Sequence, residues 1–261
     1  MRTLFFALSA LLLTSHSFAQ TTGENPVTPS SPESIAGASL DVMIASLDAQ
    51  AQAIYTVSLG QQPVTWLSPA LQAKDTERTA DPTKKLNREF NAMIIQSLTG
   101  STNADFGYFS EGSHDSSSAN TNIASGYKAI GQFHTHPWNY EELQNLAFSP
   151  QDILMLYRTD YDQKFLVNFP YLILAGTEYY ALVVLDADKA LTHFQGLQKM
   201  AAAKNQSMND FMNAYFYTVN HGDDIEDITN NSIMLETGML HESGIAFYRK
   251  KPGEPSELLN P

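Results

Sequence analysis

Two histidines separated by one residue and followed by a proline constrain this chain more than any other feature. The segment from Ile130 to Pro137 reads IGQFHTHP, with His134 and His136 near its end. Side chains two positions apart in a β-strand point to the same face, so a strand here presents both imidazoles together. Pro137 lacks an amide hydrogen and is expected to end the strand. The pair can therefore supply two adjacent ligands to a metal ion.

A short capped helix is expected downstream of this strand. Ser149 is a favourable N-cap residue, and Pro150 suits the first helical position. Asp152 then falls in the first turn, where a carboxylate is compatible with the helix dipole and can turn back to the strand's end. A catalytic zinc ion keeps three protein ligands and one open position. The sequence therefore predicts Zn²⁺ held by His134, His136 and Asp152, with the Ser149 hydroxyl close by.

Other zinc chemistries are excluded by residues that the chain lacks. It has no cysteine, which removes cysteine ligands, thiol nucleophiles and the P-C-x-x-C motif of deaminases. It has no H-E-x-x-H, so it is not a zincin. An H-x-H-x-D-H pattern is absent because Trp138 and Asn139 follow Pro137. The lysostaphin-type H-x-x-x-D is absent because Ser118 stands four positions after His114.

The N-terminus and the charge indicate where the protein acts and on what. Arg2, an apolar run over 4–13 and a small-residue site ending at Ala19 predict a signal peptide over 1–19. A polar leader over 20–33 follows, so we expect a periplasmic or secreted protein with no membrane span after cleavage. The net charge of −13 disfavours nucleic acid and anionic lipid. Small molecules, peptides, peptidoglycan and other proteins remain as partners, and a peptide, protein or peptidoglycan substrate is expected.

Hydrophobic periodicity predicts a mixed α/β fold with a single sheet flanked by helices. The expected helices cover 32–55, 69–73, a stretch from 149 onward, 187–204 and 207–217. The expected strands cover 89–96, 106–109, 127–136, 169–174, 179–185 and 246–249. The expected irregular segments are a polar loop over 112–121, an acidic loop over 220–231 and a tail over 250–261.

The H-T-H-P strand followed by Ser149-x-x-Asp152 resembles the JAMM (MPN-plus) zinc metallopeptidase motif, E…H-[S/T]-H-P…S-x-x-D. With Asn87-Arg88-Glu89 before a strand and F-S-P-Q-D-I at 148–153, the chain is most similar to the JAMM-like domains of bacterial toxins and secreted proteins. The resemblance covers 34–185 and leaves 186–261 as a mostly helical C-terminal extension and tail. It implies a JAMM/cytidine-deaminase-like core and zinc-dependent hydrolysis of peptide or isopeptide bonds.

The resemblance also implies a glutamate as general base on an earlier strand and a serine that stabilises the oxyanion. Glu89 and Ser149 are expected in these roles, with Glu111 as the alternative base. Twelve residues separate His136 from Ser149, more than in the common motif, so 138–146 are expected to form an insertion that shapes substrate binding. The alternative to catalysis is a non-catalytic JAMM-like module for binding, immunity or assembly.

Overall fold

A computed structural model describes residues 31–58, 89–111, 122–137, 148–156, 166–217 and 225–261. All of them belong to one compact unit, Ser31–Pro261. The predicted signal peptide, most of the leader, the helix over 69–73, the loop over 112–121 and the insertion over 138–146 lie outside the described residues.

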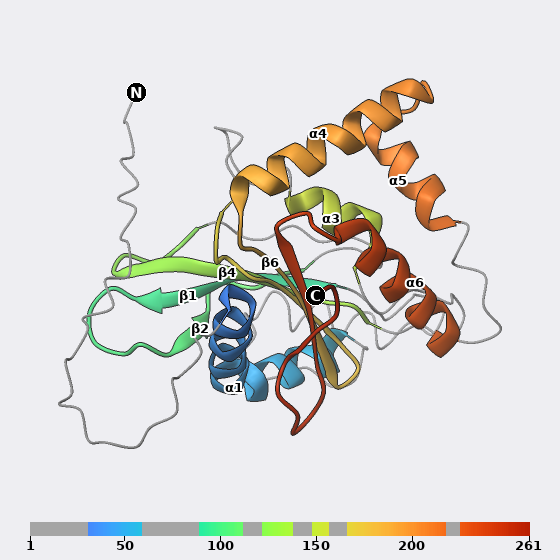
Figure 1. Cartoon of the computed structure of the whole chain (residues 1–261). Coiled ribbons are helices and arrows are strands. Elements are labelled where there is room, and N and C mark those ends of the chain that lie inside the picture. The colour runs from blue at the N-terminus through green and yellow to red at the C-terminus, as the bar shows by residue number, and fades with distance from the viewer. Residues whose placement is uncertain (1–30, 59–88, 112–121, 138–147, 157–165, 218–224) are drawn as a thin grey trace, which may run out of the picture. The chain divides into compact units, whose positions relative to one another are not determined.

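One mixed sheet of eight strands forms the centre of this unit (Figure 1). The strands are β1 (Phe90–Ser97), β2 (Ala104–Phe106), β3 (Ser110–Glu111), β4 (Tyr127–Thr135), β5 (Tyr171–Ala175), β6 (Glu178–Val184), β7 (Ile245–Lys250) and β8 (Glu257–Leu258). Their order is β2-β1-β4-β5-β6-β7-β8, and β3 also pairs with β1. Every pairing is antiparallel except that of β4 with β5, which is parallel.

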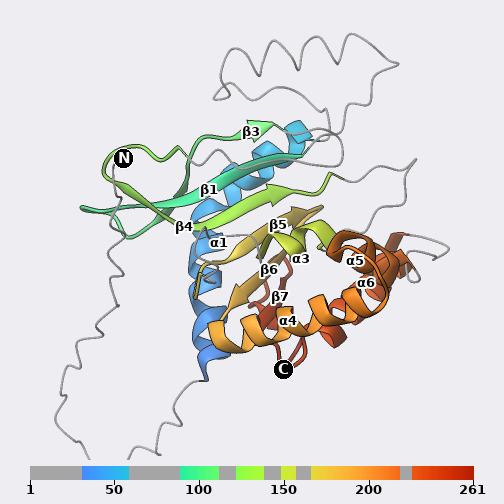
Figure 2. The same ribbon diagram turned by 90° about the horizontal axis from the view of Figure 1, so that it is seen from above.

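Helices cover both faces of the sheet, as Figures 1 and 2 show. Helix α1 (Pro32–Ser58) lies on one face, which we call the α1 face. The opposite face, the α3–α6 face, carries α3 (Pro150–Leu156), α4 (Ala187–Ala203), α5 (Met208–Tyr217) and α6 (Ile225–Leu240). The predicted mixed α/β fold with one helix-flanked sheet is confirmed. No helix in the described part of the chain is long and apolar enough to span a membrane.

Each face has its own apolar core. On the α1 face, the helix packs Leu40, Ile44, Leu47 and Ile54 against Phe90, Phe133 and Leu172 of the sheet. On the α3–α6 face, Ile153, Leu197, Met212 and Leu240 pack against Ile173, Leu182 and Phe247. Alternate residues of β5 and β6 thus enter opposite cores, and this explains why both strands read as continuous apolar runs. The predicted hairpin is confirmed, with Gly176 at positive φ in its turn.

The C-terminal residues belong to the same sheet as the rest. Strand β7 confirms the predicted last strand and pairs with β6, and β8 pairs with β7. The tail expected over 250–261 is instead held by Asn260. Its Oδ1 accepts from the Phe247 N–H at 2.7 Å, and its Nδ2 donates to the Ile245 carbonyl at 2.7 Å. Residues 186–261 therefore supply two strands of the sheet and parts of both cores.

Two local predictions were wrong. The acidic loop expected over 220–231 is helical from Ile225, where α6 begins. Acidic residues are favoured in the first turn of a helix, so the polarity of this segment was misread as a loop. The strand expected over 106–109 is instead β2 over Ala104–Phe106, and residues 107–109 lie in no strand.

Helix α1 runs through Gly37, where a Cβ would lie 3.3 Å from Tyr248 Cε1. This glycine therefore lets the helix approach β7 closely.

Gly131 allows the same kind of close approach in β4. A Cβ added to it would lie 3.0 Å from the Pro170 carbonyl oxygen and 3.1 Å from Ile94 Cδ1. We expect Gly131→Ala to lower the free energy of unfolding by about 1–3 kcal/mol, measured by urea denaturation. The control is Gly196→Ala in α4, where a Cβ meets nothing within 4 Å. That change should leave stability unchanged or raise it by up to about 1 kcal/mol. Equal effects of the two changes would contradict the close approach at Gly131.

Candidate metal centre

Three side chains from two elements converge at the end of β4. His134 Nε2 lies 3.1 Å from His136 Nε2 and 3.2 Å from Asp152 Oδ1. His136 Nε2 lies 3.3 Å from Asp152 Oδ2. The side chains are 10%, 10% and 18% exposed, so the cluster is largely shielded from water. These three residues can hold a metal ion, as the spacing of the sequence motif predicted.

Strand β4 places both histidines on the α3–α6 face. Phe133, between Gln132 and His134, enters the core of the α1 face. Side chains alternate along a strand, so His134 points the other way. Its register partner on β5 is Ile173, which lies in the core of the α3–α6 face. The His136 N–H donates to the Leu174 carbonyl at 2.9 Å, which continues the pairing with β5 beyond the end of β4.

A reciprocal capping box orients Asp152 toward the histidines. The Asp152 N–H donates to Ser149 Oγ at 3.2 Å, and the Ser149 N–H donates to Asp152 Oδ2 at 2.7 Å. Two of the amides at this helix end are thereby satisfied. The predicted N-cap is confirmed, and the same carboxylate that closes the cap also faces both imidazoles. Ser149 is therefore linked to the metal centre through Asp152.

The separations within the cluster fit a tetrahedral metal ion. Ligand atoms about 2.0–2.1 Å from a tetrahedral zinc ion lie about 3.3–3.4 Å from one another. The observed separations are 3.1 Å between the two imidazole nitrogens, and 3.2 and 3.3 Å from these nitrogens to the two different oxygens of Asp152. Without an ion, the lone pairs of two neutral imidazoles would repel if neither Nε2 carried a proton, so one Nε2 must be protonated. A cation held by both nitrogens and the carboxylate removes this repulsion.

The charge state of Asp152 is the one a metal ligand requires. Burial raises the pKa of this carboxyl, but attraction to His134 and hydrogen bonds from His134 and His136 outweigh that effect. Together they hold the pKa of Asp152 well below its ordinary value. The carboxylate therefore stays ionised, which is the form that binds a metal.

Glu89 and Glu111 differ in their place in the sheet. Glu89 immediately precedes β1, in which Asn91 is paired with His134. Because side chains alternate along a strand, Glu89 shares the sheet face of Asn91, which is also the face of the histidines. Position 111 is instead paired with Phe90, which lies in the core of the α1 face. The register is thus compatible with Glu89 as the base, and its role stays a prediction.

Sequence reasoning missed two polar residues beside the cluster. Asn91 is 3% exposed, and its Oδ1 accepts from Gln132 Nε2 at 3.4 Å. Thr135 is fully buried, and its Oγ1 accepts from the Phe90 N–H at 3.0 Å. Thr135 is the middle residue of the H-T-H-P motif, so the sequence already placed it next to the predicted ligands. Nothing in the sequence indicated that Asn91 would be buried against β4.

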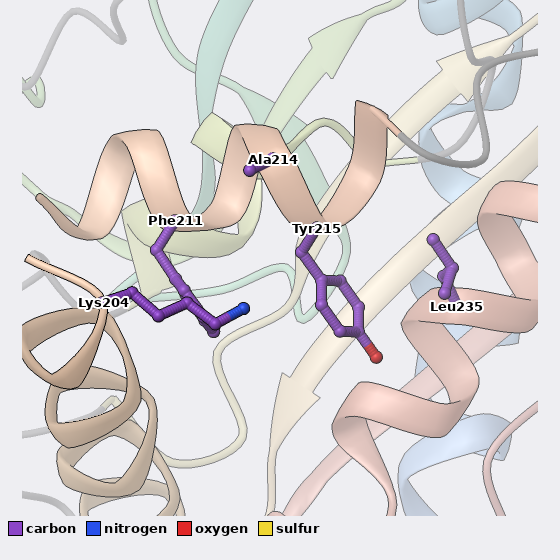
Figure 3. Close-up of a pocket in the computed structure, with 5 residues that line it drawn as sticks. All are labelled: Lys204, Phe211, Ala214, Tyr215 and Leu235. Atoms are coloured by element: carbon purple, nitrogen blue, oxygen red, sulfur yellow. The ribbon is translucent and has the colours of Figure 1, made fainter. Parts of the chain in front are cut away.

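A separate cavity of about 250 Å³ lies among α4, α5 and α6. Figure 3 shows Phe211 and Tyr215 projecting from α5, with Lys204 and Leu235 on the neighbouring segments. The Lys204 ammonium lies 5.3 Å from the centre of the Phe211 ring. None of the residues shown lining this cavity belongs to the metal cluster.

Comparison with known proteins leaves the resemblance resting on the motif alone. No protein-family model matches the chain, and no match was found among curated proteins or solved structures.

Proposed function

We propose that the protein is an exported, zinc-dependent hydrolase of amide bonds, with a JAMM-type site and core. Its substrates would be peptide or isopeptide bonds in proteins, or the stem peptides of peptidoglycan. The observation that carries the proposal is the convergence of His134, His136 and Asp152, with Ser149 capping the same helix. The signal-like N-terminus and the acidic composition support export and a substrate other than nucleic acid.

The donor set suits Zn²⁺ in particular. Two imidazole nitrogens and one carboxylate, with a fourth position open to water, are the ligands of many catalytic zinc sites. When bound there, the ion would polarise the scissile carbonyl and lower the pKa of a water molecule. Calcium and magnesium prefer all-oxygen coordination, which this pair of histidines does not supply.

The protein side chains would handle the proton and the developing charge. Glu89 would take up a proton from the attacking water and return it to the nitrogen of the leaving amine. In that exchange the water oxygen forms the new C–O bond, and the amide C–N bond breaks. Ser149 Oγ already accepts from the Asp152 N–H, so its hydroxyl hydrogen can point at the substrate oxygen. That donor would stabilise the oxyanion of the tetrahedral intermediate.

Metal binding can be tested against a matched control within the chain. The protein should bind one Zn²⁺, measured by metal analysis and chelator competition. Loss of a residue that only hydrogen-bonds a metal ligand typically weakens metal affinity about 10- to 100-fold. Asp152→Asn should weaken zinc affinity by more than this, because it changes a ligand itself. Ser207 and Asp210 form a second Ser-x-x-Asp cap in which the Asp210 N–H donates to Ser207 Oγ at 3.1 Å. Asp210→Asn should leave affinity unchanged.

Binding should also weaken as the pH falls, since protons compete with the metal for the imidazoles. Affinity that is independent of pH, or equal in both variants, would contradict this site.

The base is tested by Glu89→Gln. We expect this change to abolish turnover and retain bound zinc, because glutamine cannot accept a proton. Cleavage is followed by mass spectrometry on a peptide pool that includes lysine-branched isopeptides, and on purified muropeptides. Chelator should abolish cleavage, and added zinc should restore it. Full activity in Glu89→Gln or in chelated protein would rule the mechanism out. A zinc-loaded protein that cleaves none of these substrates would instead favour the non-catalytic binding, immunity or assembly module.

The oxyanion donor is tested by a pair of cap substitutions. Ser149→Ala should lower kcat by about 100- to 1000-fold, as loss of one oxyanion donor does elsewhere. It also removes an N-cap, which costs about 0.5–2 kcal/mol of stability. Ser207→Ala removes the equivalent cap of α5 and should cost similar stability with no loss of kcat. Equal kcat in the two variants would show that Ser149 is only a cap.

A further inference from the structure

The hydroxyl of Thr135 joins the two strands of the site where both end. Thr135 lies between the two histidines and is fully buried. Its Oγ1 accepts a hydrogen bond of 3.0 Å from the Phe90 N–H, 45 residues away in the chain. The register of β1 with β4 runs from the pair Ser97–Tyr127 to the pair Asn91–His134. The threonine bond therefore extends the contact between the strands by one more residue, toward Glu89.

This bond holds the peptide group that links Glu89 to Phe90. A peptide group is planar, and its plane includes both the N–H of the second residue and the Cα of the first. Holding the Phe90 N–H therefore also holds the carbonyl group and Cα of Glu89. The ψ torsion of Glu89, its side-chain torsions and the chain before it remain to be set.

Asn91 holds the backbone on the other side of Phe90. Its Oδ1 accepts from Gln132 Nε2 at 3.4 Å, and its carbonyl accepts from Ser110 Oγ at 3.3 Å. Asn91 is paired with His134, so continuing the antiparallel register by two pairs sets Glu89 opposite His136. The contacts of Thr135 and Asn91 thus place Glu89, the residue just before β1, at the end of β4 that carries the imidazoles.

We propose that Thr135 is a positioning residue, which holds Glu89 beside the metal centre through the Phe90 N–H. The inference rests on the proposed function, because it assumes that Glu89 acts as the base. Thr135 alternates with the histidines along β4, so its side chain points to the α1 face. It can therefore act on the chemistry only through the backbone of β1. A bond that merely satisfied a buried amide would leave the position of the carboxylate unaffected.

The first test measures position without any substrate. The full protein is labelled with ¹³C-glutamate and loaded with Co²⁺, a paramagnetic substitute for zinc. Paramagnetic relaxation of the Glu89 carboxyl carbon, assigned by its loss in Glu89→Gln, reports its distance from the metal. Thr135→Val removes the acceptor and keeps the branched shape, so relaxation should weaken and the Phe90 amide should exchange faster. Thr135→Ser keeps an acceptor and should restore both signals.

The second test measures turnover on the best substrate found above. Thr135→Val should lower kcat by about 10- to 100-fold with little change in KM, because a small misplacement of a catalytic group carries that cost. Thr135→Ser should recover most of the rate. Bound cobalt and its visible spectrum should be the same in every variant.

The outcomes separate the two proposals. Unchanged relaxation of Glu89 in Thr135→Val, or an unchanged kcat in that variant, would overturn the role of Thr135 alone. Loss of metal in Thr135→Val that Thr135→Ser does not restore would also overturn it, because the residue would then support the ligands. Absence of Co²⁺ binding in the unaltered protein, or full activity of Glu89→Gln, would overturn the proposed function itself.

Discussion

The site depends on the position of β4, which is hydrogen-bonded along both of its edges. It pairs antiparallel with β1 and parallel with β5. The pairing with β5 continues past the strand through the His136 N–H, and the pairing with β1 continues through Thr135 Oγ1. Both imidazoles are thus held by backbone contacts on two sides before any metal binds. Preorganised ligands lose little conformational freedom on binding, which favours a tight and well-defined site.

Much of the fold was predictable because its signals are local. The apolar run of the hairpin, the alternation in β4 and the N-cap at Ser149 each act over a few residues. The three residues that could hold a metal followed from the same local rules, because strand alternation and the first turn of a helix restrict where side chains can point. The grouping of His134, His136 and Asp152 was therefore within reach of the sequence, whereas the identity of the metal remains part of the proposal.

The remainder was not predictable because it depends on contacts between distant residues. The strand at Ile245–Lys250 was expected, but nothing local indicated β6 as its neighbour. Asn260 reads as part of a polar tail until its amide meets the backbone of β7. The start of α6 was mistaken for a loop, because its polar first turn hides the helix. Asn91 reads as an ordinary strand residue until the register sets it against His134.

The contacts of Tyr248 have a consequence for how the chain folds. Its hydroxyl donates to the Glu33 carbonyl at 2.7 Å, across 215 residues, and its ring packs over Gly37. The N-terminal helix and a late strand therefore cover each other, and the core of the α1 face is not closed until both ends of the chain are present. Long-range contacts of this kind slow folding, because loop-closure entropy is lost before the contacts form. Folding of this unit is thus completed only after nearly all of its sequence has been synthesised.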